Sequence, residues 1–90
     1  MISGMGIGVR AGVGRVIAAN LRAERARHGW TQQHLADLLG TSQTTVSQAE
    51  AGHRALDPDD LLALCAALQV PLQRLLIGVD DGHLQVLGLR

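Results

Sequence analysis

Four uncharged polar side chains with close spacing are the residues of this chain best suited to binding a ligand. They are Gln43, Thr44, Ser47 and Gln48. Amides and hydroxyls both donate and accept hydrogen bonds. In a DNA major groove, Gln can make a bidentate contact with adenine, while Ser and Thr adapt to several bases. A polar helix face is more often simply solvated, so the interpretation depends on the elements around it.

A helix-turn-helix would place these side chains on an outward face. Thr31 is a suitable N-cap, and Leu35, Leu38 and Leu39 follow at the i, i+3, i+4 spacing of one apolar helix face. Gly40 then provides a residue that adopts the left-handed conformation at a helix end with little steric cost. The pattern predicts a short helix that ends at Gly40.

A second short helix should follow directly. Thr41 or Ser42 is its expected N-cap, and Val46 and Ala49 are its inward positions. Small residues at a helix crossing, here Ala36 and Ala49, allow the close approach that a steep crossing with a short turn requires. The outward face of this second helix carries the four polar side chains.

The spacing of this motif resembles the helix-turn-helix family of phage lambda repressor and Cro. The match extends from about Ile17 through Leu76 and implies an all-α, compact five-helix bundle, dimeric binding to an operator and, usually, repression of transcription. Five positions carry the match, counted from Gln32 as the first: Gln32, then Ala36 as the fifth, Gly40 as the ninth, Val46 as the fifteenth and Ala49 as the eighteenth.

The resemblance also implies roles for individual residues. It places Gln43, Thr44, Ser47 and Gln48 at base-contacting positions, and Gln32 at a position that binds a phosphate. Arg25 and Glu50 match a pair that forms an internal salt bridge in several members. Further candidate phosphate contacts are Thr45, Arg54 and, on the first helix, Arg22. Many members have a proline where this chain has Leu56, so the resemblance does not predict the path of this loop.

Composition is consistent with one small helical domain. The chain has 90 residues, of which 47% are hydrophobic but only 1% aromatic, with Trp30 the single aromatic residue. An aliphatic core of this kind favours helices that pack on helices. The formal net charge is zero, but residues 1–34 carry five arginines against one glutamate, and the rest carries three arginines against seven acids. We therefore expect a basic side, few phosphate contacts and a shallow salt dependence of DNA binding.

Several classes of site are not predicted. No arrangement of residues resembles a nucleophile with its base, so we do not expect an enzyme. Four histidines lack metal-ligand spacing, which predicts neither a metal nor a cofactor. Cys65, the single cysteine, is expected to be an inert core thiol. Without a long apolar stretch or a signal-peptide pattern, we expect a cytoplasmic protein.

Three segments are expected along the chain. Residues 1–12 contain four glycines and should form a flexible N-terminal arm. Arg10 and Arg15 could touch DNA, but a disordered tail is the more common case for such a segment. Residues 13–78 should form the helix-turn-helix domain, with a first helix from about Val13 to His28, a fourth capped by Asp57, and a fifth that ends before Gly78. Residues 79–90 show strand-like alternation after a turn signal. This tail could be disordered, insert into a partner or, as we prefer, form a dimerisation strand with a second copy.

The sequence as a whole predicts a transcriptional regulator that binds double-stranded DNA in a sequence-specific manner. We expect a repressor that binds a palindromic operator as a homodimer. One alternative is an antitoxin with the same DNA-binding fold and a protein toxin as its partner. Another is a helical protein-interaction module without DNA binding, which the neutral charge and the absence of lysine would permit.

Overall fold

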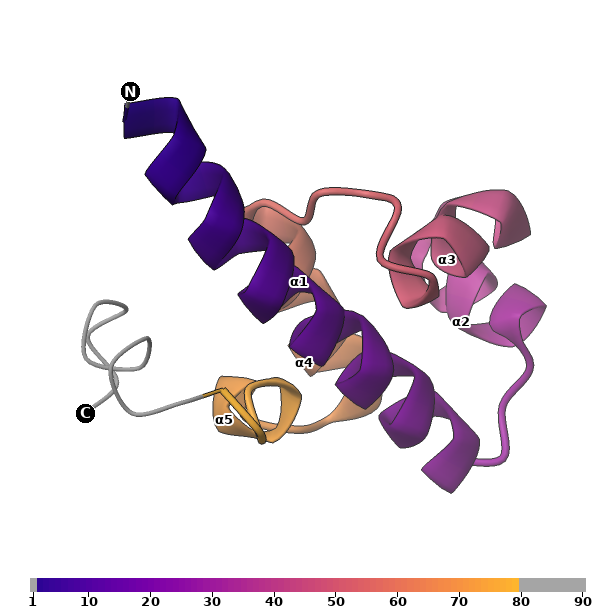
Figure 1. Cartoon of the computed structure of the whole chain (residues 1–90). Helices are drawn as coiled ribbons and strands as arrows, with labels where there is room; N and C mark the ends of the chain where they lie inside the picture. The colour runs from indigo at the N-terminus through magenta and orange to yellow at the C-terminus, as the bar shows by residue number, and fades with distance from the viewer. Residues whose placement is uncertain (1, 80–90) are drawn as a thin grey trace.

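Five helices make up the part of the chain that the structure describes (Figure 1). This computed structural model describes the backbone of residues 2–79 and the side chains of residues 12–79. Within this part the fold is all-α, as predicted. The strand expected in the tail falls on residues 80–90, which lie outside the described residues. The helices are α1 (Ile2–Arg27), α2 (Gln32–Leu39), α3 (Gln43–Glu50), α4 (Pro58–Leu68) and α5 (Leu72–Leu75).

Helix α1 begins earlier than the sequence predicted. It starts at Ile2 rather than at about Val13, so residues 2–12 continue the helix where we expected an irregular arm. Each glycine costs about 1 kcal/mol relative to alanine in a helix, which is why the sequence pointed to an arm. No proline interrupts this stretch, however, and a helix that is nucleated in a packed segment extends cooperatively. The end is as predicted: α1 stops at Arg27, and Gly29 follows with a φ of 73°.

Local capping interactions set the bounds of α2 and α3. The Thr31 side chain accepts a hydrogen bond from the backbone N–H of His34 at 3.0 Å, which begins α2. Gly40 ends α2 in the left-handed conformation, with a φ of 70°. Of the two expected caps for α3, the structure uses Ser42, whose hydroxyl accepts from the backbone N–H of Thr45 at 3.1 Å. The predicted turn is therefore confirmed.

The core is aliphatic and joins all the helices. Its main cluster contains the fully buried Leu21, Leu35, Leu68 and Leu75, which come from α1, α2, α4 and α5. A smaller cluster forms around Ile17, Leu76 and Val79, where α1 meets α5 and the residues after it. Figure 1 shows α1 crossing the bundle, with α2 and α3 at one end of it and α5 on the other side.

The loop between α3 and α4 packs on this core through Leu56. This residue is half-buried and contacts both hydrophobic clusters. An aliphatic side chain thus anchors the loop whose path the sequence alone did not predict. The loop ends at Asp57, which forms a capping box with Asp60 and precedes Pro58 in the first position of α4.

The short helix α5 is held by a side chain of α1. The Asn20 amide donates hydrogen bonds to the backbone carbonyls of Leu75 and Ile77, each at 2.8 Å. These carbonyls lie at the end of α5, where intrahelical donors are lacking. None of the helices in the described part is long and apolar enough to span a membrane.

Truncation of a core leucine should destabilise this bundle strongly. Leu68 is fully buried, so we expect Leu68→Ala to lower the free energy of unfolding by roughly 2–5 kcal/mol, through lost burial and a cavity. Leu62 lies on the same helix but is 69% exposed, and Leu62→Ala should change it by less than about 0.5 kcal/mol. Urea unfolding followed by circular dichroism measures both. Equal losses in the two variants would contradict the placement of α4.

Candidate nucleic-acid interface

Helix α3 has a buried face and an exposed polar face. Val46, Ala49 and Glu50 are buried, which fixes the inward side of the helix. Of the four predicted base-contacting residues, Gln43, Thr44 and Gln48 are exposed and Ser47 is half-buried. Figure 1 shows α3 at the edge of the molecule, with α2 beside it. The structure thus brings all four side chains together on one short helix at the surface.

The first residue of α3 is connected to the first residue of α2. The Gln43 amide donates a hydrogen bond to Oε1 of Gln32 at 2.6 Å. Gln32, which is half-buried, in turn donates to Oε1 of Glu50 at 3.1 Å. Side-chain hydrogen bonds therefore run from the exposed end of α3, across α2, to the buried end of α3. We call Gln43, Gln32, Glu50 and Arg25 the polar relay.

Arg25 completes the polar relay from α1. Its Nε donates to Oε2 of Glu50 at 2.5 Å, and a second guanidinium nitrogen donates to Oε1 at 3.0 Å. A third contact, at 2.6 Å, goes to the backbone carbonyl of Trp30. The side chain of Glu50 is 2% exposed and that of Arg25 is 16% exposed. The hydrogen bond with Glu50 raises the pKa of Arg25, while burial acts in the opposite direction.

The aromatic ring of Trp30 is half-buried and packs against the main core cluster. It stacks on the ring of His28 with a centroid separation of 4.3 Å, and the ring of His34 lies 5.0 Å away on a tilt. His28 also forms a 2.8 Å hydrogen bond with the backbone carbonyl of Leu68. The histidines near α2 thus take part in packing around the segment that joins α1 to α2.

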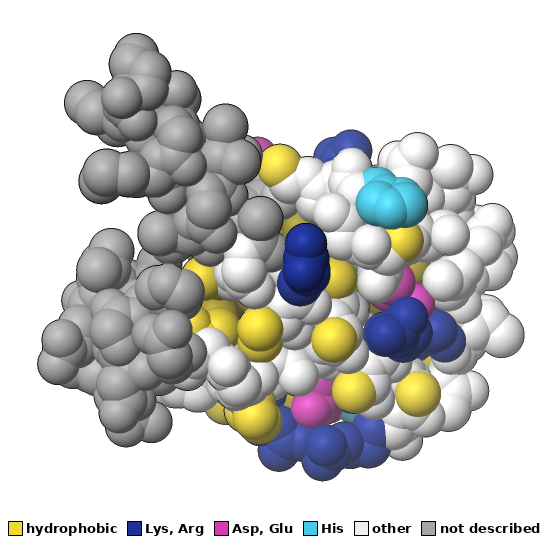
Figure 2. Space-filling view, in the orientation of Figure 1, with side chains coloured by type: hydrophobic (Ala, Val, Ile, Leu, Met, Phe, Trp, Pro, Cys, Tyr) yellow, Lys and Arg dark blue, Asp and Glu magenta, His cyan; other side chains and the backbone are white. Residues whose placement is uncertain are grey.

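The candidate phosphate contacts do not form one basic patch. Thr45 is half-buried and shares a 2.9 Å hydrogen bond with the hydroxyl of Ser42. Arg22 is exposed on α1, and Arg54 is exposed in the loop after α3. On the face of the molecule that Figure 2 shows, the arginine side chains lie in separate places.

Half of the arginines with described side chains are used inside the molecule. Arg25 binds Glu50, while Arg27 and Arg74 both bind Glu24, at 3.6 Å and 2.9 Å. The other three form no salt bridge with another described residue; they are Arg15, Arg22 and Arg54. Within the described part of the chain, three arginines thus remain available for DNA phosphates.

Sequence reasoning missed two features that hold the candidate interface. The link from Gln43 to Gln32 was not expected, because each residue was assigned to DNA alone. The buried Glu24, which binds Arg74 fifty positions away, was also missed. A signal was available for Glu24, since it lies three positions after the inward Leu21 on α1 and a carboxylate there requires a partner.

Comparisons with known proteins agree with this geometry. Residues 21–75 match the model of a family described as Helix-turn-helix. Over 65 residues the chain is 34% identical to the competence pilus inhibition repressor of Acinetobacter baylyi. The matched segment covers 72% of this chain and 59% of that protein. The chain therefore spans about three fifths of the length of this curated relative.

Solved structures of regulators have a similar fold. The clp gene regulator ClgR of C. glutamicum is 29% identical and superposes with a TM-score of 0.69, covering 72% of this chain and 84% of that one. The restriction-modification controller protein C.AhdI of Aeromonas hydrophila is 30% identical, with a TM-score of 0.64, covering 68% of this chain and 92% of that one.

Loss of the Glu50 charge should lower the free energy of unfolding of the fold that holds α3. Glu50→Gln would leave Arg25 without its anionic partner in a largely buried place. We expect a loss of roughly 3 kcal/mol in the free energy of unfolding, near the lower end for a broken buried pair because Arg25 retains some exposure. The control is Asp37→Asn, which removes an exposed carboxylate that binds Gln33 and should have little effect. Chemical denaturation would contradict the role of the pair if both variants were equally stable.

Proposed function

This chain belongs to the lambda-repressor-like helix-turn-helix family, and from that premise we propose that it represses transcription by binding a palindromic DNA operator as a homodimer. The observation that carries this proposal is the exposed amide and hydroxyl face of α3, supported from below by the polar relay. A short helix of this kind fits a major groove, whose base edges match these side chains in hydrogen-bonding chemistry.

The polar relay leaves Gln43 able to bind a base. A glutamine amide has two N–H donors and one carbonyl acceptor. Gln32 accepts from one of these N–H groups, so the second N–H and the carbonyl of Gln43 remain. A bidentate contact with adenine needs one donor and one acceptor. Gln32 thus restricts the rotamers of Gln43 before DNA binds and lowers the entropic cost of ordering that side chain.

Affinity would come from two copies. One helix-turn-helix covers a half-site, and a dimer that places two α3 helices about 34 Å apart would bind two half-sites one helical turn from each other. Occupation of such an operator would exclude RNA polymerase from an overlapping promoter. One relative, 34% identical over 65 residues, is named as a repressor. Its name supports repression rather than activation as the proposed effect.

Removal of the Gln43 amide should reduce both affinity and base discrimination. Once an operator has been selected from a random DNA pool, Gln43→Ala should weaken binding to it by roughly 1–3 kcal/mol and relax the preference at one position of each half-site. Gln73→Ala, at an exposed glutamine on α5, is the matched control and should bind as the unmodified chain does. Unchanged binding of the Gln43 variant to every operator variant would refute this assignment.

Removal of a phosphate contact should act differently. Arg22→Gln should weaken binding to all sequences about equally and lower the slope of log K against log salt by about 1. Arg27→Gln changes the same residue type on the same helix, but Arg27 is exposed and binds Glu24 at 3.6 Å, so this variant should leave the slope unchanged. Fluorescence anisotropy over a salt series measures the slopes. An unaltered slope for Arg22→Gln would remove this residue from the interface.

A further inference from the structure

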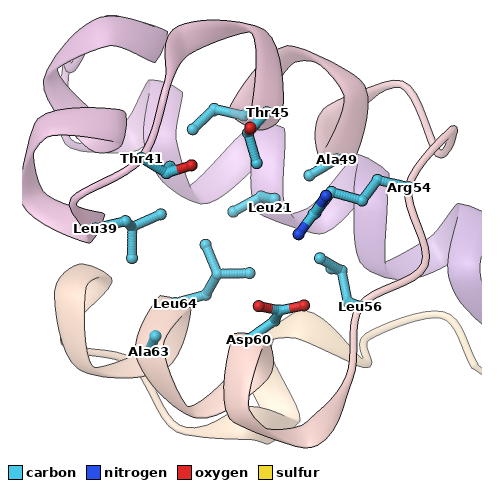
Figure 3. A pocket seen from close by; sticks show the side chains of 11 residues that line it. Leu21, Leu39, Thr41, Thr45, Ala49, Arg54, Leu56, Asp60, Ala63 and Leu64 are labelled. Carbon is cyan, nitrogen blue, oxygen red and sulfur yellow. The ribbon is translucent and has the colours of Figure 1, made fainter.

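A pocket lies directly beneath α3. It opens between α2, α3, the following loop and α4, and has a volume of about 120 Å³ (Figure 3). Four leucines, from α1, α2, the loop after α3 and α4, form much of its apolar part. They are Leu21, Leu39, Leu56 and Leu64. Part of its wall belongs to α3 itself, through Val46 and Ala49, so an occupant would touch the inner side of the recognition helix.

The polar part of the pocket carries opposite charges. Arg54 and Asp60 both line it, and Figure 3 shows the guanidinium and the carboxylate directed into the space. Both residues lie in the described part of the chain, and no salt bridge joins them. The hydroxyl of Thr41 also faces the space. A cation and an anion thus line one apolar pocket without a direct salt bridge; one carboxylate oxygen of Asp60, Oδ2, accepts a 3.2 Å hydrogen bond from the backbone N–H of Asp57.

The dimensions limit the occupant. A cavity of about 150 Å³ lined by aliphatic side chains accommodates benzene, which has six carbon atoms. A volume of 120 Å³ therefore suits a branched aliphatic group of about four carbons.

We propose that this pocket binds a free aliphatic α-amino acid of the leucine and valine class. The branched side chain would lie among the leucines, the carboxylate would bind Arg54, and the ammonium group would bind Asp60. A simple carboxylic acid would bring a second anion near Asp60, and a simple amine would bring a second cation near Arg54. Only the zwitterion satisfies both charges and the apolar part together.

The proposed ligand would oppose DNA binding, a consequence that rests on the proposed function. Arg54 lies two residues after Gly52 in the loop that follows α3, and it is also a candidate phosphate contact. A carboxylate bound to Arg54 would compete with a DNA phosphate for the same guanidinium. Linkage requires the reverse effect as well: DNA would lower the affinity for the amino acid by the same factor. We expect a reduction of about five- to tenfold, at the low end of typical coupling between sites.

Ligand binding can be tested without DNA. The purified chain is titrated with L-leucine, isovalerate and isoamylamine, which share the branched group and differ in their charges, and binding is followed by calorimetry and by amide shifts in NMR spectra. We expect saturable binding of L-leucine, at least tenfold tighter than of the other two, with shifts concentrated in residues 39–64. Absence of saturable binding, or equal binding of all three compounds, would overturn the proposal.

Two variants on α4 test the location of the site. Ala63 lines the pocket, so Ala63→Leu would fill it without removing a charge and should abolish leucine binding. Ala66→Leu makes the same change on the same helix at an exposed position outside the pocket and should bind leucine normally. Arg54→Gln should weaken binding at least tenfold and supports the location if the first variant fails to fold. Normal binding by folded Ala63→Leu or by Arg54→Gln would refute it.

The coupling is tested last, with the selected operator. L-leucine should weaken operator binding of the unmodified chain and have no effect on Ala63→Leu. If leucine binds but DNA does not, the ligand site stands and the proposed function fails. If DNA binds and leucine does not, the proposed function stands and the ligand site fails.

Discussion

The buried carboxylate of Glu50 determines how the three helices around it are arranged. It lies at the end of α3, receives two hydrogen bonds from Arg25 of α1 and one from Gln32 of α2, and its side chain is 2% exposed. A buried carboxylate without partners would cost several kcal/mol. A packing that buries Glu50 must therefore bring α1 and the start of α2 to the end of α3, and in this structure that arrangement sets the direction in which the polar face of α3 points.

This constraint matters because α3 cannot maintain its own orientation or structure. An isolated helix of eight residues is not stable in water, since nucleation is unfavourable and few backbone hydrogen bonds follow it. Only Val46 and Ala49 bury apolar side chains on its inner side, and both are small. A buried ion pair adds little net stability compared with an apolar pair, but its geometry discriminates between alternative packings. In this fold the leucines supply stability, and the polar relay supplies the position of α3.

The sequence predicted those features that depend on neighbouring residues. Thr31, Gly40 and the start of α4 follow from capping rules that act within four positions, and the inward leucines follow from helical periodicity. The pairing of Arg25 with Glu50 came from the family resemblance. The predicted start of α1 was wrong, because we gave the glycine content of residues 1–12 more weight than the absence of a proline that would end the helix. Helical periodicity could have placed Glu24 on the inward face of α1, but it could not identify Arg74, fifty positions away, as its partner. The pocket beneath α3 is likewise formed by residues far apart in the sequence.

The distribution of charge suggests how such a neutral domain discriminates between DNA sequences. Three of its six arginines with described side chains are bound to buried carboxylates, which leaves three of these six for phosphates. Phosphate contacts supply most of the affinity for arbitrary DNA, and this affinity falls steeply with salt. If phosphate contacts are few, the amide and hydroxyl contacts that we propose for α3 would supply a larger share of the binding free energy. Weak binding to arbitrary DNA would then follow from the same pairs that hold α1, α3 and α5 together.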